Sequence, residues 1–286
     1  MPELPELTVW ARQVDEELTG KTIAAVETPQ PKCLNVTPEE MAALVVGRTV
    51  RGARERGKWM IIDLAGPGGI DSHLLLNLGM GGDFYYRRAP GKSTPAGEPV
   101  REPDKYQFRL SFTDGAGLAL RFWWFGYIHA VKAGELARHD MTASLGPSPL
   151  DPDMDLACFR AMVAARPRRS AKSFLLDQKI LAGIGNVYAQ DSLWGAGLHP
   201  GRLLGSLSEA EVEAFWRSVR RVLGQSIAKG GLAYERDFFG RSGGLTGDDF
   251  AVGYKSGKPC PKCGAAIQKI KSGSSSTYIC PDCQKV

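Results

Sequence analysis

The stretch Gly257-Lys-Pro-Cys260-Pro-Lys-Cys263, then sixteen residues, then Cys280-Pro-Asp-Cys283 decides the fold of the C-terminal tail. Each Cys-x2-Cys pair places two thiolates on one turn, and the spacer is long enough to form a hairpin between the two turns. Four sulfur ligands leave no open position for water. The pattern therefore predicts one structural zinc ion that folds a ribbon and takes no part in catalysis, with disulfide bonds as the alternative.

The same tail is basic. From Val252 onward it carries one acid, Asp282, against six lysines: Lys255, Lys258, Lys262, Lys269, Lys271 and Lys285. The whole chain has a net charge of +5 and a pI near 8.8, so a polyanionic partner that contacts the tail is expected. The two isolated cysteines, Cys33 and Cys158, are interpreted as buried small apolar residues.

Upstream, the N-terminal part is predicted to be mostly antiparallel β-structure behind one helix. Apolar residues at helical spacing run from Leu4 to Leu18, with Gly20 as a stop. Alternating side chains predict a hairpin over 106–122 with a turn at 113–115. Further strands are predicted at Thr22–Val26, Trp59–Leu64, Leu74–Met80 and Phe84–Tyr86. A loop is expected over 87–104.

The middle of the chain is predicted to be helical. Three prolines within 145–153 mark a boundary, because they cannot continue a helix or a central strand. Helical spacing follows over 156–165, 174–180, 186–194 and 209–227, and Ser208 with Glu211 predicts a capping box for the last of these helices. The turn Gly183-Ile-Gly185-Asn186 enters a helix, where free amides can hold a phosphate. A purely structural glycine turn is the alternative.

Composition bounds the class of protein. The 286 residues are 43% apolar, enough for two or three folding units. Apolar runs fall far short of the ~20 residues of a membrane span, and the first ten residues lack the basic region of a secretory signal. We therefore expect a cytoplasmic protein with no membrane partner.

The N-terminus Met1-Pro2-Glu3 offers distinctive chemistry. Met1 precedes a small residue, so its removal would leave Pro2 as a free secondary amine. An α-amino group titrates near ~8 against ~10.4 for lysine, so roughly a hundredfold more of it is unprotonated at neutral pH. Attack on a sugar C1′ would give an iminium ion, which is an electron sink. A simple helix start with well-placed acids is the alternative.

Together these motifs resemble the formamidopyrimidine-DNA glycosylase and endonuclease VIII family over the whole chain. The resemblance is carried by Pro2–Glu6, Gly20–Ile23, Leu78–Met80 with Gly82, Leu175–Gln178, Gly183–Tyr188, Ala196–Pro200 and Cys260–Gln284. It implies an α+β multidomain fold. We expect an N-terminal helix with an antiparallel β-sandwich over 1–140, a helix-two-turn-helix domain over 141–247 and a zinc ribbon over 248–286.

The resemblance also implies roles for particular residues. Pro2 would be the Schiff-base nucleophile, Glu3 the acid and Lys58 a phosphate-binding helper at the catalytic centre. Met80 would fill the space left by a flipped-out nucleotide, with a core methionine as the alternative. The other residues expected at the DNA interface are Glu6, Asn77, Trp123, Trp124, Lys172, Gly185, Asn186, Lys255, Lys269 and Lys271. The loop Gly230–Phe239 would cover the flipped base.

Three positions depart from the family pattern. Ser275 stands where the zinc hairpin usually has a phosphate-binding arginine, and Asn77 stands where a histidine usually precedes Leu-Gly-Met. An Asp-Pro-Arg insertion, whose arginine pairs with the orphaned base, is replaced by Trp123-Trp124. We hypothesise that a tryptophan stacks into the gap, which would suit single-stranded or distorted DNA. The alternative is that both tryptophans are core strand residues.

The sequence therefore predicts a DNA repair glycosylase with AP lyase activity that acts on damaged DNA by β-elimination, with δ-elimination left open. It would be a monomer associated with a bacterial nucleoid and would need no small-molecule cofactor. A family member that binds damaged DNA without excision is the first alternative, and a zinc-ribbon transcription or RNA-processing factor is the second. The excised base and the opposite-base preference are not predicted.

Overall fold

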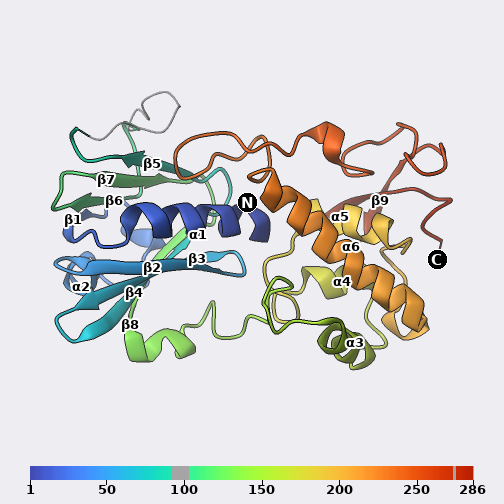
Figure 1. Ribbon diagram of the computed structural model, residues 1–286, viewed down its shortest axis with the longest axis horizontal. Coiled ribbons are helices and arrows are strands. Elements are labelled where there is room, and N and C mark those ends of the chain that lie inside the picture. The colour runs from blue at the N-terminus through green and yellow to red at the C-terminus, as the bar shows by residue number, and fades with distance from the viewer. Residues whose placement is uncertain (92–102, 273–274, 286) are drawn as a thin grey trace. The chain divides into compact units, whose positions relative to one another are not determined.

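The computed structural model describes residues 1–91, 103–272 and 275–285 (Figure 1). The predicted loop over 87–104 lies largely outside the described residues. The chain forms two compact units, one made of residues 1–144 and 229–244 and the other of residues 145–228 and 245–286. Within the described parts of the chain, no helix is both long enough and apolar enough to cross a bilayer.

The described residues of the first unit form two four-stranded sheets in which every neighbouring pair is antiparallel. One sheet has the strand order β2 (Thr49–Arg56), β3 (Trp59–Gly66), β4 (Gly69–Asn77), β8 (Tyr127–Lys132). The other has the order β1 (Ile23–Glu27), β6 (Phe108–Phe112), β7 (Gly117–Arg121), β5 (Asp83–Arg87). The unit also holds helices α1 (Leu4–Leu18) and α2 (Pro38–Val45) and the short 3-10 turns Pro31–Cys33 and Ala133–Arg138.

Local sequence explains most of these strands. The predicted hairpin forms as β6 and β7, with Phe108 opposite Leu120 and Leu110 opposite Leu118, so the alternating apolar residues share the buried face. The strand predicted over 74–80 ends instead at Asn77. Gly79 follows with φ +55°, a left-handed conformation that cannot continue a strand.

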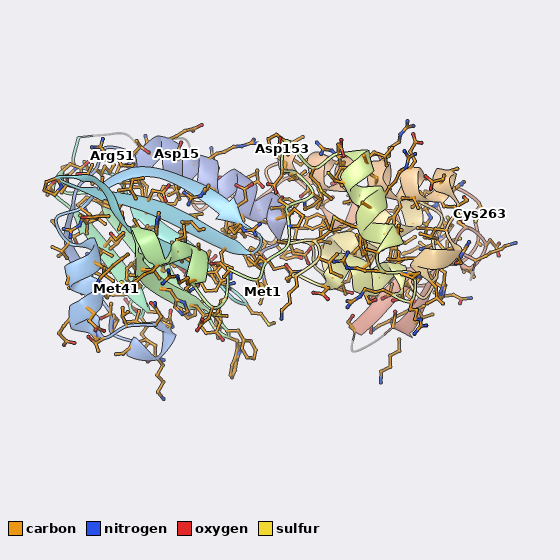
Figure 2. All side chains as sticks on the ribbon, turned by 90° about the horizontal axis from the view of Figure 1, so that it is seen from below. Met1, Asp15, Met41, Arg51, Asp153 and Cys263 are labelled. Atoms are coloured by element: carbon orange, nitrogen blue, oxygen red, sulfur yellow. The ribbon has the colours of Figure 1, made fainter. Side chains whose placement is uncertain are left out.

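Helix α1 lies along both sheets in Figure 1 and contributes its apolar stripe to their common core. Trp10 is fully buried and meets Phe84 edge-on, with ring centroids 5.5 Å apart. On the polar side of the helix, Asp15 (Figure 2) accepts the backbone N–H of Ala53 in β2 at 3.0 Å. The segment 229–244 joins this core through Phe238. Helix α1 is thus tied to both sheets and shares its core with the segment 229–244.

The second unit is helical and ends in a small finger. Its elements are α3 (Leu156–Ala164), α4 (Ala171–Leu176), α5 (Asn186–Gly195), α6 (Glu209–Ala228), β9 (Gln268–Ser272), β10 (Ser275–Ile279) and the 3-10 turns Leu204–Ser206 and Gly247–Asp249. The predicted capping box is present, since Ser208 and Glu211 exchange side-chain and backbone hydrogen bonds.

Helix α4 corrects one predicted range. It occupies 171–176 rather than 174–180. Ser170 caps its start by accepting the N–H of Ser173, and Asp177 ends it in an extended conformation. Tyr188 of α5 and Ser226 of α6 share a buried hydrogen bond of 2.6 Å, which ties the two helices together.

Candidate active site and DNA-binding elements

The first candidate site is the N-terminus. The acids at the start of α1, Glu3 at its N-cap and Glu6 in its first turn, are both buried. Pro2 is buried, Glu3 is 3% exposed and Glu6 is 0% exposed. Glu6 accepts the backbone N–H of Glu3 at 3.0 Å through one oxygen and that of Leu232 at 3.2 Å through the other. One carboxylate therefore fixes both the helix start and the segment 229–244 beside it. Glu6 is among the residues that the sequence predicts at the DNA interface; in the structure its side chain instead accepts backbone N–H groups.

A further carboxylate stands beside the chain terminus and was not singled out from the sequence. An oxygen of Glu235 lies 3.9 Å from the N-terminal nitrogen of Met1, a residue labelled in Figure 2. Burial raises the pKa of Glu235; the terminal ammonium opposes that rise, and the negative charges of Asp83 and Glu3 add to it. Only a fold that returns 229–244 to the sheet unit could reveal this proximity, because no motif spacing encodes it.

Lys58 occupies the tight turn between β2 and β3 and is half-buried. The next residue, Trp59, is buried and packs on two histidines of β8 and the following turn, with ring centroids 5.3 Å from His129 and 5.5 Å from His139. His129 Nδ1 and His139 Nε2 are 2.7 Å apart. This aromatic cluster anchors the strand that follows Lys58.

Met80 and the two consecutive tryptophans lie together at the surface. The N–H of Met80 donates to the carbonyl of Trp124 at 2.8 Å, and the N–H of Trp123 donates to the carbonyl of Met80 at 3.0 Å. Met80 is 49% exposed and each tryptophan 66%, so the readings that placed these three residues in the core are wrong. Asn77 is buried, and its Oδ1 accepts the N–H of Gly79 at 3.0 Å, which holds the turn before Met80.

In the second unit, the buried ammonium of Lys172 donates hydrogen bonds to oxygens of the finger strands β9 and β10. Its Nζ donates to Ser275 Oγ at 2.9 Å, to the Ser272 carbonyl at 3.3 Å and to the hydroxyl of Thr277. Ser275 in turn donates to Asn186 Oδ1 at 3.2 Å. Burial lowers the pKa of Lys172. Ser275, the residue in place of the expected arginine, therefore connects the buried lysine to the start of α5.

The glycine turn before α5 is held by one side chain. Gln178 accepts the N–H of Gly183 at 2.8 Å and donates to the carbonyl of Ile184 at 2.7 Å. Gly183 has φ +98°, which a side chain would strain. Gly185 is the N-cap of α5, and Asn186 is its first residue. The turn thus presents the positive end of a ten-residue helix.

Four cysteine sulfurs converge in the finger (Figure 2 labels Cys263). All four lie within 4.8 Å of one another, and the Cys263–Cys280 and Cys260–Cys283 sulfurs are 3.4 and 3.9 Å apart. Tetrahedral ligands at ~2.3 Å from zinc would stand roughly 3.8 Å apart, whereas a disulfide needs about 2.0 Å. Each of the four is a free cysteine, so the set fits zinc and not disulfides.

The remaining cysteines and the finger lysines differ in their exposure. Cys33 is buried, as expected, but Cys158 is exposed on α3, so the interpretation of Cys158 as a core residue is wrong. Lys269 and Lys271 are exposed on β9 at positions two apart, which face the same side of a strand. Lys255 is half-buried and donates to the carbonyl of Asp248.

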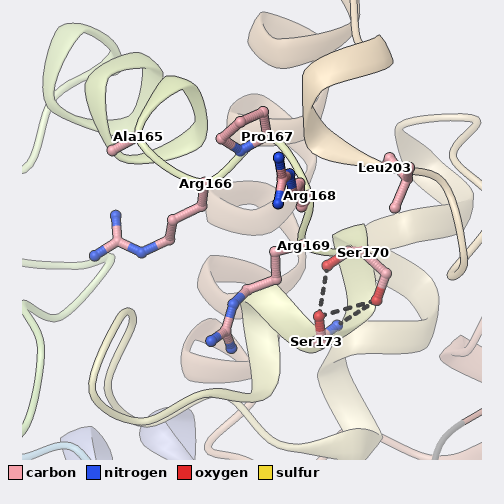
Figure 3. Close-up of a pocket in the computed structure, with 8 residues that line it drawn as sticks. All are labelled: Ala165, Arg166, Pro167, Arg168, Arg169, Ser170, Ser173 and Leu203. Atoms are coloured by element: carbon pink, nitrogen blue, oxygen red, sulfur yellow. Dashed lines mark hydrogen bonds between the residues drawn. The ribbon is translucent and has the colours of Figure 1, made fainter.

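A basic hollow lies on the same unit as α4 (Figure 3). It is lined by Arg166, Arg168 and Arg169 with Ser170, Ser173 and Leu203. Arg169 is paired with Asp177 at 2.7 Å, and Arg166 donates to the carbonyl of Met162. Sequence reasoning did not predict this feature.

Three family models match consecutive parts of the chain. The formamidopyrimidine-DNA glycosylase N-terminal domain matches residues 1–123, the formamidopyrimidine-DNA glycosylase H2TH domain matches 145–236, and the zinc finger found in FPG and IleRS matches 257–286. With the four sulfurs described above, the third match shows one structural zinc. These domains define a zinc-finger protein of the helix-two-turn-helix class.

Relatives that are similar over the whole chain show which family it belongs to. The formamidopyrimidine-DNA glycosylase of Geobacillus kaustophilus is 35% identical and covers 100% of both chains, and that of Chloroflexus aurantiacus is 33% identical over 99% of this chain and 98% of its own. The chain therefore belongs to the formamidopyrimidine-DNA glycosylase family.

Solved structures agree. Lactococcus lactis Fpg bound to abasic-site DNA has a TM-score of 0.85 at 26% identity, covering 99% of this chain and 100% of that one. MutM bound to DNA containing carbocyclic 8-oxo-G also has a TM-score of 0.85 at 26% identity, covering 100% of both chains. The α+β fold expected from the sequence is confirmed.

Proposed function

We propose that this chain excises damaged bases from DNA by attack of the Pro2 amine on the sugar C1′. As a member of its family it is a DNA glycosylase with AP lyase activity in base excision repair. The observation that carries the particular mechanism is the start of the chain: the buried Pro2 directly precedes two buried acids, Glu3 and Glu6, and a third acid, Glu235, lies 3.9 Å from the nitrogen of Met1.

The reaction begins once Met1 has been removed. The lone pair of the Pro2 nitrogen forms a bond to C1′ as the C1′–N bond to the damaged base breaks, and Glu3 supplies a proton to the sugar or to the departing base. The nitrogen then gives up its N–H proton and the C1′–O4′ bond breaks, with the proton taken up by O4′, so the sugar ring opens and the nitrogen and C1′ form an iminium ion. Loss of a C2′ proton moves electrons toward that cation and expels the 3′ phosphate, which cleaves the strand by β-elimination.

Carboxylates around the terminus assist in two ways. Glu6 holds the backbone N–H groups of Glu3 and Leu232, which keeps the amine in one position relative to the segment 229–244. Glu235, which lies 3.9 Å from the nitrogen of Met1, would stand near the Pro2 nitrogen once Met1 is removed. As a carboxylate there it would stabilise the positive charge of the iminium. Lys58 would bind a phosphate next to the target sugar.

DNA phosphates would be held by groups on the second unit. The Lys172–Ser275–Asn186 chain places positive charge behind the start of α5, where Gly185 and Asn186 lie at the positive end of the helix. Lys255, Lys269 and Lys271 add charge on the finger. Because Lys172 already donates to three oxygens, we assign it a positioning role rather than a direct phosphate contact.

The wider organisation is also proposed. Residues 1–140 would carry the chemistry, 141–247 and 248–286 would bind DNA, and the protein would act as a monomer at the bacterial nucleoid. Bacterial relatives support the setting. Neither the comparisons nor the described structure supports a member of the family that binds DNA without excision, or a transcription or RNA-processing factor.

Borohydride trapping on an abasic-site oligonucleotide tests the proposal. We expect the wild-type protein to become covalently joined to the DNA, and a version whose N-terminal nitrogen is acetylated to give no adduct. Glu3→Gln should bind the same DNA with little change but react more slowly by at least ~100-fold, the usual scale for loss of a general acid. Trapping by the acetylated protein would refute the assignment of Pro2.

A further inference from the structure

The turn between β7 and β8 displays three consecutive aromatic side chains. Trp123 and Trp124 are each 66% exposed, and Phe125 is 67% exposed. Among the described large hydrophobic residues these three are the most exposed. A contiguous patch of exposed apolar side chains is a common mark of an interaction site, so this tip is the candidate binding surface.

The tip is held in shape by close backbone contacts. Two backbone hydrogen bonds join Met80 to Trp123 and Trp124. A Cβ on Gly79 would stand 2.1 Å from the carbonyl oxygen of Trp124, and a Cβ on Gly81 would stand 2.5 Å from Cδ1 of Trp123. Both glycines also have positive φ. Only glycine permits the backbone approach at Gly79, so the turn that carries Trp123 and Trp124 is held close to residues 79–81.

Two further features fit a nucleic-acid ligand. The guanidinium of Arg121 lies over the Trp123 ring, 5.2 Å from its centroid, which brings positive charge to one face of that ring and leaves Trp124 as the residue tested for stacking. Phe125 adopts φ +55°, a conformation that is sparsely populated for bulky residues and clusters at functional positions. The turn therefore combines aromatic rings that can stack on a flat ligand with one nearby cation, the guanidinium of Arg121.

We propose that Trp123 and Trp124 form a stacking platform for unpaired bases, so that the preferred substrate class is a lesion in single-stranded DNA. The inference rests on the proposed function, because it concerns the DNA strand that Pro2 attacks. An indole face stacks on any base. Its single N–H donor cannot make the bidentate contact that distinguishes one base edge from another. The platform therefore accepts unpaired bases without reading an opposite one.

The test uses one abasic-site oligonucleotide as a single strand and as four duplexes with A, C, G or T opposite the site. We expect the single strand to be cleaved at least as fast as any duplex. The four duplexes should agree within about threefold, less than the ~5-fold that even 1 kcal/mol of base discrimination would give. A preference of roughly tenfold or more for one opposite base, or for duplex over single strand, would overturn the proposal.

Variants locate the effect. Trp124→Ala should weaken binding of lesion-free oligothymidine by about 5- to 150-fold, which is the ~1–3 kcal/mol of one base–aromatic stack at 1.4 kcal/mol per factor of ten. Trp124→Phe should retain most of the binding. Ile70→Ala removes a 45% exposed apolar side chain from the first residues of β4 in the same unit and serves as the matched control, with binding unchanged.

Three readouts separate the outcomes. If Trp124→Ala lowers single-strand and duplex cleavage by the same factor, the platform is not specific for unpaired bases and the proposal is wrong. Unchanged oligothymidine binding by Trp124→Ala would also refute it, provided that its urea unfolding matches wild type. Absence of borohydride trapping on every substrate refutes the proposed function instead, so the two failures are distinguishable.

Discussion

The buried pair of histidines in the sheet unit should make that unit sensitive to acid. His129 is 8% exposed, and its Nδ1 lies 2.7 Å from Nε2 of His139. Burial, with a smaller contribution from the neighbouring His139, lowers the pKa of His129 from 6.5 to about 4. Between these two values the unfolded chain binds a proton that the folded chain does not.

The sign and the magnitude follow from linkage. The stabilisation is fully present above pH 6.5 and is lost as the pH falls toward 4. For one group with these two pKa values, the free energy of unfolding falls by about 2 kcal/mol between pH 7 and pH 5, and by about 3 kcal/mol by pH 4. Since Trp59 packs on both rings, the strand that follows Lys58 should loosen first.

Urea unfolding at a series of pH values measures this loss. We expect the wild-type midpoint to fall between pH 7 and pH 5 and His129→Asn to show a shallower dependence, although that variant is less stable at pH 7 because it loses the contact with His139. If His129→Asn and the wild type lose stability in parallel over this range, the acid sensitivity has another source and the reasoning is refuted.

Three other predictions concern the DNA-binding elements and their support. Lys172→Met should weaken DNA binding with little change in the slope of log K against log salt, because the lysine positions Ser275; a slope smaller by about 0.9 would show a direct phosphate contact instead. Chelation of zinc should unfold the finger, given apparent binding energies of about 10–16 kcal/mol for structural zinc, and should abolish DNA binding; unchanged affinity after verified metal loss would contradict this. Gly79→Ala should lower the unfolding free energy by at least ~1–3 kcal/mol, because its Cβ would stand 2.1 Å from the Trp124 oxygen; urea midpoints equal to wild type would disprove the clash.

Local patterns were sufficient for much of the fold. The β6–β7 hairpin follows from side chains that alternate between Phe108 and Phe122, and the zinc site follows from the spacing of four cysteines. The strand β2 was missed because its sequence, TVRGARER, carries no apolar alternation and is stabilised by pairing with β3. Tertiary pairing overrides local preference in such a strand.

Some residues of the candidate site belong to local motifs, and others are brought together only by the tertiary fold. Pro2, Glu3 and the glycine turn belong to motifs that the sequence displays, so they could be named in advance. Glu235 lies more than two hundred residues from Met1 in the chain, yet meets its nitrogen at 3.9 Å because Phe238 packs in the sheet core. The link from Lys172 to Ser275 joins α4 to β10. Neither contact has a periodic or spaced signature that could have revealed it.

The same limit applies to the aromatic tip. The sequence shows Trp123-Trp124 but not whether they face the core, since a strand of alternating residues would bury one of the two. Their exposure follows from the backbone bonds to Met80 and from glycines at 79 and 81. These are properties of the folded turn.

The attacking group is tested most directly by mass spectrometry of the borohydride-trapped complex. After proteolysis, we expect an N-terminal peptide that lacks Met1 and carries the reduced sugar adduct on the Pro2 nitrogen. An adduct on a lysine such as Lys58, or a trapped peptide that still begins with Met1, would contradict it.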